Sequence, residues 1–283
     1  MMERILRGIG DFVVLVSLGL IVLLMFLPFQ ASAMTAEDVM KKSQAAFLYP
    51  GKDFKARVVM KLISKEGKER LREMTMLRKN YGEIGGDQKY FIYFFQPADV
   101  RNMTFMVYKY PAKNDDRWLF VPAIDLVRRI AASDARSSFV GSDFTYEEVS
   151  GRDISTDTHT LLREEKLGGK DCYIVESVPK EPIDYVKRIS WIDKGTFLPL
   201  KEEYYDVQKE LGRVFTADKI EDVAAAEGRE RKSFSTITKR TMKNLKTGHR
   251  TEVTFTSSSY NIGLPDDIFT ERYLRNPPER WIK

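Results

Sequence analysis

The chain has 283 residues, of which 31% are charged, a formal net charge of +5 and a single cysteine. One cysteine excludes an internal disulfide, and the basic residues are interspersed with acidic ones, which argues against a nucleic-acid-binding surface. The two histidines, His159 and His249, lie far apart and lack the paired spacing of a metal site, so we interpret both as surface residues.

The first residues have the pattern of a signal peptide. Arg4 and Arg7 form a basic start, residues 12–29 are almost wholly apolar, and Ala31-Ser32-Ala33 matches a cleavage site. This pattern predicts a cleaved signal peptide and a mature chain that begins at Met34. The alternative is an uncleaved anchor, because an apolar run of about 18 residues approaches the length that spans a bilayer.

We therefore expect a signal peptide at residues 1–33 and one exported domain at residues 34–283, located in the periplasm. Since no cysteine follows the apolar run within this leader, we expect no lipidation at the mature N-terminus. The remaining cysteine, Cys172, follows the turn Gly168-Gly169 in an apolar segment, which is typical of a buried strand residue.

The mature chain begins with one predicted helix, followed by a long series of strands. Thr35 and Asp38 form a capping-box pattern, and Pro50-Gly51 ends the helix. Residues 54–62 then alternate between apolar and basic side chains, and residues 70–78 return after a turn. The sequence predicts a hairpin here.

The next strands are apolar on both faces. Residues 90–95 and 103–108 contain aromatic and methionine side chains at consecutive positions, so a sheet built from them needs cover on both sides. Two further strands flank Pro122-Ala123. Beyond residue 158, strands recur every ten to fifteen residues, which leaves little room for crossover helices. In one of these strands Tyr185 and Trp191 are expected on the same face. This rhythm predicts an antiparallel meander of about eleven strands.

An aromatic and acidic segment lies between these two groups of strands. The runs RWLFVP, RRI and FVGSDFTYEE, at residues 117–122, 128–130 and 139–148, resemble a signature of the outer-membrane lipoprotein-sorting proteins, relatives of the carriers LolA and LolB. Val140 replaces the usual methionine and Glu148 the usual aspartate. The resemblance extends over most of the mature chain and is to the branch associated with RND/MMPL-type exporters.

The resemblance implies a mainly β (α+β) fold, in which a curved antiparallel incomplete β-barrel has helices across its open mouth. It also implies a periplasmic carrier that binds acyl chains of lipids or lipoproteins in an apolar hollow and moves them between the inner and outer membrane. We expect no cofactor, a monomer, and an inner-membrane RND/MMPL-type exporter as partner.

Methionine and aromatic side chains suit such a hollow, because they adapt to flexible chains and keep them from water. The residues expected to line it are Met60, Met74, Met76, Tyr90, Ile92, Phe94, Met106, Trp118, Phe120, Phe139, Phe144, Tyr146 and Trp191. Residues 139–149 would then form a lid, with Arg128, Arg129 and Asp143 as its latch.

Three alternatives remain open at this stage. The same apolar side chains could only fill the core. The chain could be a non-transporting envelope interaction or lipid-sensing module that works with an inner-membrane RND-type protein. It could also be a hydrolase that uses Asp143 and Glu147, although the nucleophile-elbow and metal-site patterns of hydrolases are missing from the sequence. We expect a protein that is not an enzyme.

Overall fold

The computed structural model describes residues 34–111, 113–226 and 232–283. The predicted signal peptide therefore lies outside the described residues. Residues Thr35–Lys283 form one compact unit. No helix among the described residues is long and apolar enough to cross a membrane.

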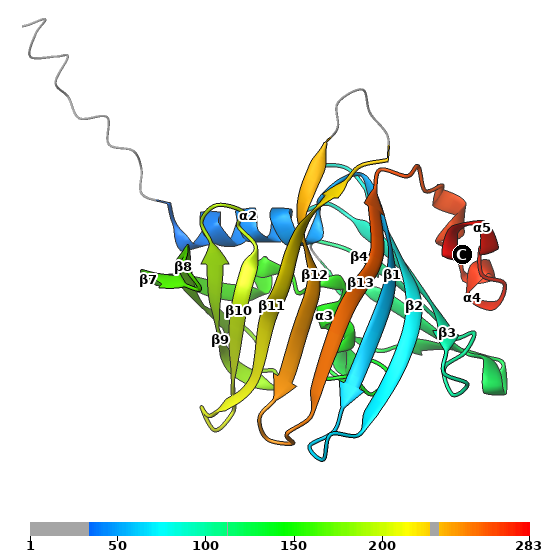
Figure 1. Cartoon of the computed structure of the whole chain (residues 1–283), viewed down its shortest axis with the longest axis horizontal. Helices are drawn as coiled ribbons and strands as arrows, with labels where there is room; N and C mark the ends of the chain where they lie inside the picture. Colours follow the sequence, from blue (N-terminus) through cyan, green and yellow to red (C-terminus); the bar gives the residue numbers. More distant parts are fainter. Residues whose placement is uncertain (1–33, 112, 227–231) are drawn as a thin grey trace, which may run out of the picture. The chain divides into compact units, whose positions relative to one another are not determined.

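A single antiparallel sheet dominates this unit (Figure 1). Counted over the described residues, it has 13 strands in the order β6-β5-β4-β3-β2-β1-β13-β12-β11-β10-β9-β8-β7. The strands are β1 Asp53–Ile63, β2 Glu69–Asn80, β3 Gln88–Gln96, β4 Thr104–Lys109, β5 Asp116–Val121, β6 Leu126–Ile130, β7 Asp157–Leu167, β8 Lys170–Pro179, β9 Tyr185–Asp193, β10 Pro199–Asp206, β11 Leu211–Ala224, β12 Ser233–Asn244 and β13 Arg250–Tyr260.

The predicted meander is confirmed, but the strand number was too low, because every extended segment of the pattern, including the short β5 and β6, pairs as a separate strand. One non-sequential pairing joins the two halves of the chain, since β1 pairs with β13. β6 and β7 remain as the two edges, so the curved sheet is an incomplete barrel.

The first helix, α2 Ala36–Leu48, begins where its sequence predicts. The Thr35 hydroxyl accepts a hydrogen bond from the Asp38 N–H at 3.1 Å, and the Asp38 carboxylate accepts one from the Thr35 N–H at 3.1 Å. These bonds satisfy N–H groups that the first helical turn leaves free. In Figure 1, α2 crosses behind the strands β9 to β12.

The remaining helical segments are short. They are α3 Tyr146–Ser150, α4 Glu271–Arg275, α5 Glu279–Ile282 and the 3-10 turns η1 Pro122–Ile124, η2 Ala132–Asp134, η3 Ile154–Thr156 and η4 Asp266–Ile268. α3 lies on the inner side of the sheet, whereas on the outer side α5 contacts β2 and α4 contacts β4 and β5 (Figure 1). Beyond the last strand, the chain therefore forms a 3-10 turn followed by two short helices.

The two faces of the sheet carry separate apolar cores. We call inner core the cluster that contains Phe54, Val58 and Met60 of β1 together with aromatic side chains of residues 139–149. The outer core joins Phe91 and Met106 to the C-terminal segment that contains η4, α4 and α5. Cover on both faces, as the apolar strands require, is therefore present.

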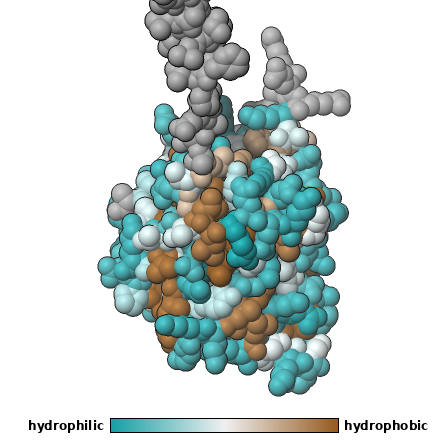
Figure 2. All heavy atoms as spheres, turned by 90° about the vertical axis from the view of Figure 1, so that its left-hand side faces the viewer, coloured by the Kyte–Doolittle hydropathy of each residue, from teal (hydrophilic) through white to brown (hydrophobic). Residues whose placement is uncertain are grey.

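Some apolar side chains stay in contact with solvent. Leu162 of β7 and Val178 of β8 are each 41% exposed. Figure 2 shows the side of the molecule that carries these strands, where apolar patches are separated by hydrophilic side chains. Near this edge Cys172 is fully buried in β8, as predicted.

Candidate functional site

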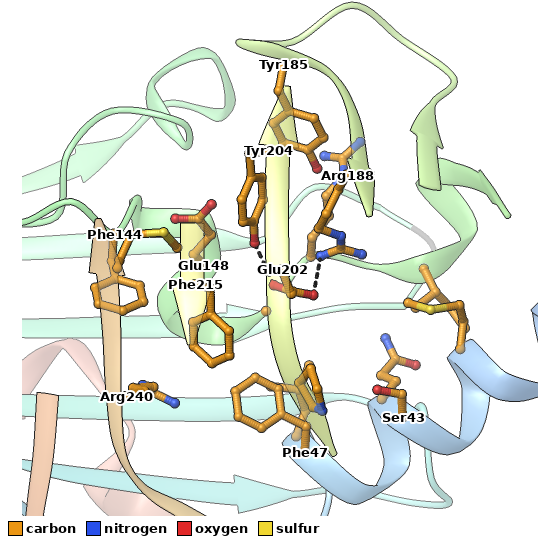
Figure 3. A pocket seen from close by; sticks show the side chains of 18 of the residues that line it. Ser43, Phe47, Phe144, Glu148, Tyr185, Arg188, Glu202, Tyr204, Phe215 and Arg240 are labelled. Atoms are coloured by element: carbon orange, nitrogen blue, oxygen red, sulfur yellow. Dashed lines mark hydrogen bonds and ion pairs between the residues drawn. The ribbon is translucent and has the colours of Figure 1, made fainter. Parts of the chain in front are cut away.

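The inner face contains three neighbouring cavities, which we call the chambers of one hollow because they share lining residues. The largest has about 760 Å³ of space between its atoms, including the part open to solvent, and Figure 3 shows its side chains. The other two measure about 560 and 380 Å³ on the same basis. Glu148 and Arg240 line all three chambers, so they lie at the junction.

The smallest chamber is lined almost entirely by apolar side chains. These come from β1, β2, β3 and β13 and from the segment that covers them: Val58, Met60, Met74, Met76, Ile92, Phe139, Phe144, Val149, Val253 and Phe255. Inward alternation along the paired strands brings these side chains together, since Met60, Met74 and Met76 belong to one face of the β1–β2 ladder. The lining of this chamber is chemically compatible with contact to an alkyl chain.

The largest chamber has a more polar wall, to which α2 contributes Phe47. Opposite, Glu202 of β10 accepts a hydrogen bond from the Tyr204 hydroxyl at 2.7 Å. Arg188 of β9 lies 3.4 Å from the same carboxylate (Figure 3). This chamber therefore combines aromatic surface with fixed charges.

Most of the residues that we predicted for the hollow lie on the inner face. Seven line its chambers: Met60, Met74, Met76, Tyr90, Ile92, Phe139 and Phe144. Phe94 and Tyr146 belong to the inner core, where they are buried behind the lining.

Three predicted residues lie on the opposite face, which corrects their assignment to the hollow. Met106, Trp118 and Phe120 pack in the outer core. In β4, Phe105 is the inward neighbour, and it is paired with Leu119 of β5. Because alternate side chains of a strand point to opposite faces, a run that is apolar at every position does not tell which half points inward.

The prediction that Trp191 lines the hollow was also wrong, for a different reason. It packs with Cys172 and Ile174 in a small separate cluster, whereas Tyr185 of the same strand belongs to the inner core. The pairing of β9 with β10 is irregular between residues 185 and 187. An irregularity of one residue reverses which side chains face inward, so Tyr185 and Trp191 point to opposite sides.

The segment that covers the hollow is residues 139–149, which we call the aromatic segment. Phe139 lies 5.2 Å from Phe105 and 5.5 Å from Tyr146, measured between ring centroids. The turn at Val140 and Gly141 has positive φ angles of 50° and 78°. This conformation reverses the chain so that Phe139 and Phe144 both point into the inner core.

Ion pairs hold the aromatic segment against the strands on one side. Arg213 of β11 lies 2.9 Å from the Glu148 carboxylate, and the Arg136 guanidinium lies 3.5 Å from it. Arg136 also lies 2.8 Å from Glu147 and 2.7 Å from Asp184. We call these residues, Arg136, Glu147, Glu148, Asp184 and Arg213, the ion-pair network.

Glu148 is the centre of this network. Burial alone would raise the pKa of its carboxyl, but Arg213 and Arg136 outweigh burial and lower the pKa to about 2. The Glu148 side chain also accepts a hydrogen bond from the Thr145 N–H at 2.9 Å, which caps α3. Glu148 therefore stays ionised, and it links the helix start to β11.

The latch that we predicted is not formed by the predicted pairs. Arg128 lies 3.3 Å from Asp134, and Arg129 pairs with Asp116, so both arginines bind carboxylates near their own strand. They are exposed on β6, an edge strand, and among the described residues neither pairs with Asp143. The ion pairs that join the aromatic segment to the strands are instead those of the ion-pair network.

Asp143 does hold the aromatic segment, but through partners that the sequence did not indicate. Its carboxylate accepts a hydrogen bond from the Thr251 hydroxyl at 2.7 Å and lies 2.6 Å from Nδ1 of His249. His159 is likewise bound, since its ring nitrogens lie 2.8 Å from the Ser177 hydroxyl and 2.9 Å from a backbone carbonyl. Both histidines are partly exposed, as their interpretation as surface residues requires, but each has hydrogen-bond partners that the sequence did not indicate.

The carboxylates considered for hydrolysis have structural partners. Glu147 lies 3.0 Å from Arg152 in addition to its contact with Arg136, and Asp143 is bound by Thr251 and His249. Within the described ranges, no cluster of three or more His, Cys, Asp or Glu side chains is placed to hold a metal ion.

Sequence reasoning missed the charged residues of the hollow. Arg240 is two residues before the buried Met242 on β12, and this spacing puts both on the same face. The spacing to Met242 could have indicated that Arg240 points inward. An arginine in an alternating strand is, however, ordinarily expected to point to solvent. Arg188 and Glu202, which also line the largest chamber, were missed for the same reason.

Comparison with known proteins gives consistent results. A family model described as that of an uncharacterized protein matches residues 86–276. A search of curated proteins gives no match. A crystal structure of a DUF1329 family protein from Desulfovibrio piger is similar, with 27% identity, a TM-score of 0.76 and coverage of 86% of this chain and 100% of that chain.

Two further crystal structures carry informative descriptions. A putative outer membrane lipoprotein-sorting protein domain from Vibrio parahaemolyticus has 26% identity, a TM-score of 0.74 and coverage of 85% of this chain and 98% of that chain. A LolA superfamily protein from Nitrosomonas europaea, at 20% identity, shows the shared fold, with a TM-score of 0.63 and coverage of 85% and 100%. The chain therefore belongs to the family of uncharacterized proteins whose model matches residues 86–276, and it is similar to a DUF1329 family protein and to a putative outer membrane lipoprotein-sorting protein domain.

Proposed function

We propose that this protein is a periplasmic carrier that binds the acyl chain of a lipid or lipoprotein in the inner-face hollow and moves it between the inner and outer membrane. The observation that carries the proposal is the apolar hollow left between the sheet and the aromatic segment. The family likeness to an outer membrane lipoprotein-sorting protein domain supports it.

The lining of the hollow fits this role. Ligand pockets are lined mainly by apolar and aromatic side chains with a few polar groups among them. An alkyl chain in the smallest chamber would contact methionine and aromatic side chains, and each buried CH₂ would contribute ~0.8 kcal/mol. Binding by burial alone needs no covalent step, so a cargo can be released unchanged.

Release requires that the cover can move. The aromatic segment closes the inner core with Phe139, Phe144 and Tyr146, and the ion-pair network fixes it to β11. Charged contacts can be exchanged for contacts with an acidic or basic surface of a partner protein, whereas purely apolar packing lacks this property. We propose an RND/MMPL-type exporter of the inner membrane as that partner.

Transfer of a fluorescent acyl lipid between donor and acceptor vesicles tests the carrier role. The protein should accelerate transfer in proportion to its concentration. Met76 lies in the wall of two chambers, so the larger side chain of Met76→Trp should occupy their space and abolish the acceleration. Met106→Trp, on the outer face, should not. Binding of the lipid without any transfer would instead indicate a non-transporting, lipid-sensing module.

A further inference from the structure

Arg240 projects from β12 into the junction of the three chambers (Figure 3). Aromatic rings surround its guanidinium: the central carbon lies 5.4 Å from the ring centroid of Phe255, 5.7 Å from that of Phe47 and 5.8 Å from that of Phe144. The rings favour a cation at this point but supply no negative charge.

Arg240 has no anionic partner among the described residues. Its Nε atom is enclosed without a hydrogen bond, and no carboxylate of the described chain forms an ion pair with its guanidinium. Nε is the only nitrogen of the Arg240 side chain that is fully enclosed without a hydrogen bond. The two terminal nitrogens therefore keep some accessible surface, and this surface faces the hollow because the side chain lines it. The guanidinium is thus available to a ligand inside the hollow.

The other arginines of the largest chamber are matched. Arg188 pairs with Glu202, Arg136 pairs with Glu148, and Arg152 lies 3.0 Å from Glu147. The wall of this chamber carries four arginines, Arg136, Arg152, Arg188 and Arg240, but only two carboxylates, Glu148 and Glu202. The excess positive charge is located at Arg240.

Burial lowers the pKa of Arg240 to about 10, because the charged form loses hydration. The side chain therefore remains protonated at neutral pH. A buried charge without a partner costs free energy, and a hydrophobic side chain of similar size would avoid this cost. An anionic ligand would remove the same cost on binding.

We propose that Arg240 binds the anionic head group of an amphiphile whose alkyl chain occupies the methionine-lined chamber. This inference rests on the proposed function and specifies its substrate class. Both a carboxylate and a phosphate can accept two parallel hydrogen bonds from a guanidinium. The head group would lie at the junction, and the tail would extend past Met76 towards Met60 and Ile92.

The test compares three ligands with the same C12 chain on protein purified after expression of the full chain: dodecanoate, dodecyl phosphate and dodecanol. Affinities are measured by calorimetry at neutral pH. Charge-assisted hydrogen bonds predict that at least one anionic ligand binds about 10- to 100-fold more tightly than dodecanol. The stronger of the two identifies the head group as carboxylate or phosphate.

Two variants make the test specific to Arg240. Arg240→Met should reduce the affinity for the preferred anion to that for dodecanol and leave dodecanol binding within about twofold of wild type, because the methionine preserves apolar volume. Arg240→Lys should keep part of the preference. Since Arg240→Met removes an unpaired buried charge, its unfolding midpoint in urea should be equal to or above that of wild type.

The outcomes separate this inference from the proposed function. Equal binding of all three ligands by wild type, or an unchanged preference in Arg240→Met, would overturn the anion site and leave the carrier proposal intact. Failure of all three ligands to bind would overturn both. An Arg240→Met variant that unfolds more readily than wild type would show that the cation serves packing, which also contradicts the inference.

Discussion

The two faces of the sheet begin with similar side chains and end with different interiors. Strands β3 and β4 carry aromatic and methionine residues on both sides, with Ile92 and Phe105 inward and Phe91 and Met106 outward. On the outer face, the chain's own C-terminal segment covers these residues. On the inner face, α2 and the aromatic segment leave a hollow. An apolar sheet face thus requires a cover, but the cover need not fill all the space over that face.

The covers are also attached differently. The outer one is fixed by apolar packing, by hydroxyl groups of the sheet and by ion pairs at its exposed rim. Thr75 donates to the Ile282 carbonyl and Thr104 to the Leu274 carbonyl, both at 2.7 Å, and Lys79 lies 2.8 Å from Asp266, whose side chain is 69% exposed. The inner one is fixed by the ion-pair network around Glu148. We expect a permanent outer cover and a movable inner cover.

The largest expected loss of stability comes from a substitution on the outer face of the sheet, where the C-terminal segment leaves no hollow. Phe269→Ala should lower the free energy of unfolding by about 3–5 kcal/mol, because Phe269 is fully buried under the outer sheet face and its loss leaves a cavity. Urea denaturation gives this value. The affinity for dodecanoate should stay unchanged in the folded variant; a change comparable to that of a hollow variant would show that the two faces are not independent.

A second, smaller effect is a pH-dependent loss of stability, which tests whether the charge of Glu148 holds the inner cover. Glu148→Gln should lower stability at pH 7 by on the order of 3 kcal/mol, because Arg213 and Arg136 lose a buried partner. The folded-state pKa of Glu148 is about 2, below its ordinary value of 4.5. The carboxylate therefore contributes fully above pH 4.5, and the contribution is lost as the pH falls towards 2.

Denaturation of wild type and Glu148→Gln from pH 7 to pH 2.5 measures this contribution. The difference between the two proteins should shrink below pH 4.5. Glu181→Gln, at an exposed carboxylate, serves as the matched control and should follow wild type throughout. A gap between wild type and Glu148→Gln that is constant over this range would mean that the charge of Glu148 does not hold the cover.

The smallest stability effects come from a matched pair of methionines. Met106→Trp should lower stability by about 1–3 kcal/mol, because Met106 is fully buried in a packed core. Met76→Trp should lower it by less than about 1 kcal/mol, because space is available beside it. Calorimetric titration with dodecanoate should show the reverse order, with binding lost in Met76→Trp alone. Equal stability losses would contradict an open inner face.

The sequence predicted the features that depend on local periodicity and capping. The capping box at Thr35, the β1–β2 hairpin and the two short strands around Pro122 follow from patterns within a few residues. Seven of the residues expected in the hollow line its chambers, because alternation in β1 and β2 is clean and the resemblance to carrier proteins implied an apolar hollow.

The errors arose where position depends on distant parts of the chain. Met106, Trp118 and Phe120 lie in strands without apolar alternation, and only the C-terminal segment settles which half is outward. Trp191 follows a pairing irregularity that local sequence does not mark. Partners from separate strands, such as Arg213 for Glu148, require the folded sheet, so the latch was assigned to arginines that are near in sequence.

Mass spectrometry of the protein, purified without detergent after export from cells, tests the central claim most directly. Our account predicts an acyl-bearing amphiphile that co-purifies near one molecule per chain, and reduced occupancy in Met76→Trp but not in Met106→Trp. A lipid-free protein that also fails to bind an added fluorescent fatty acid would contradict it.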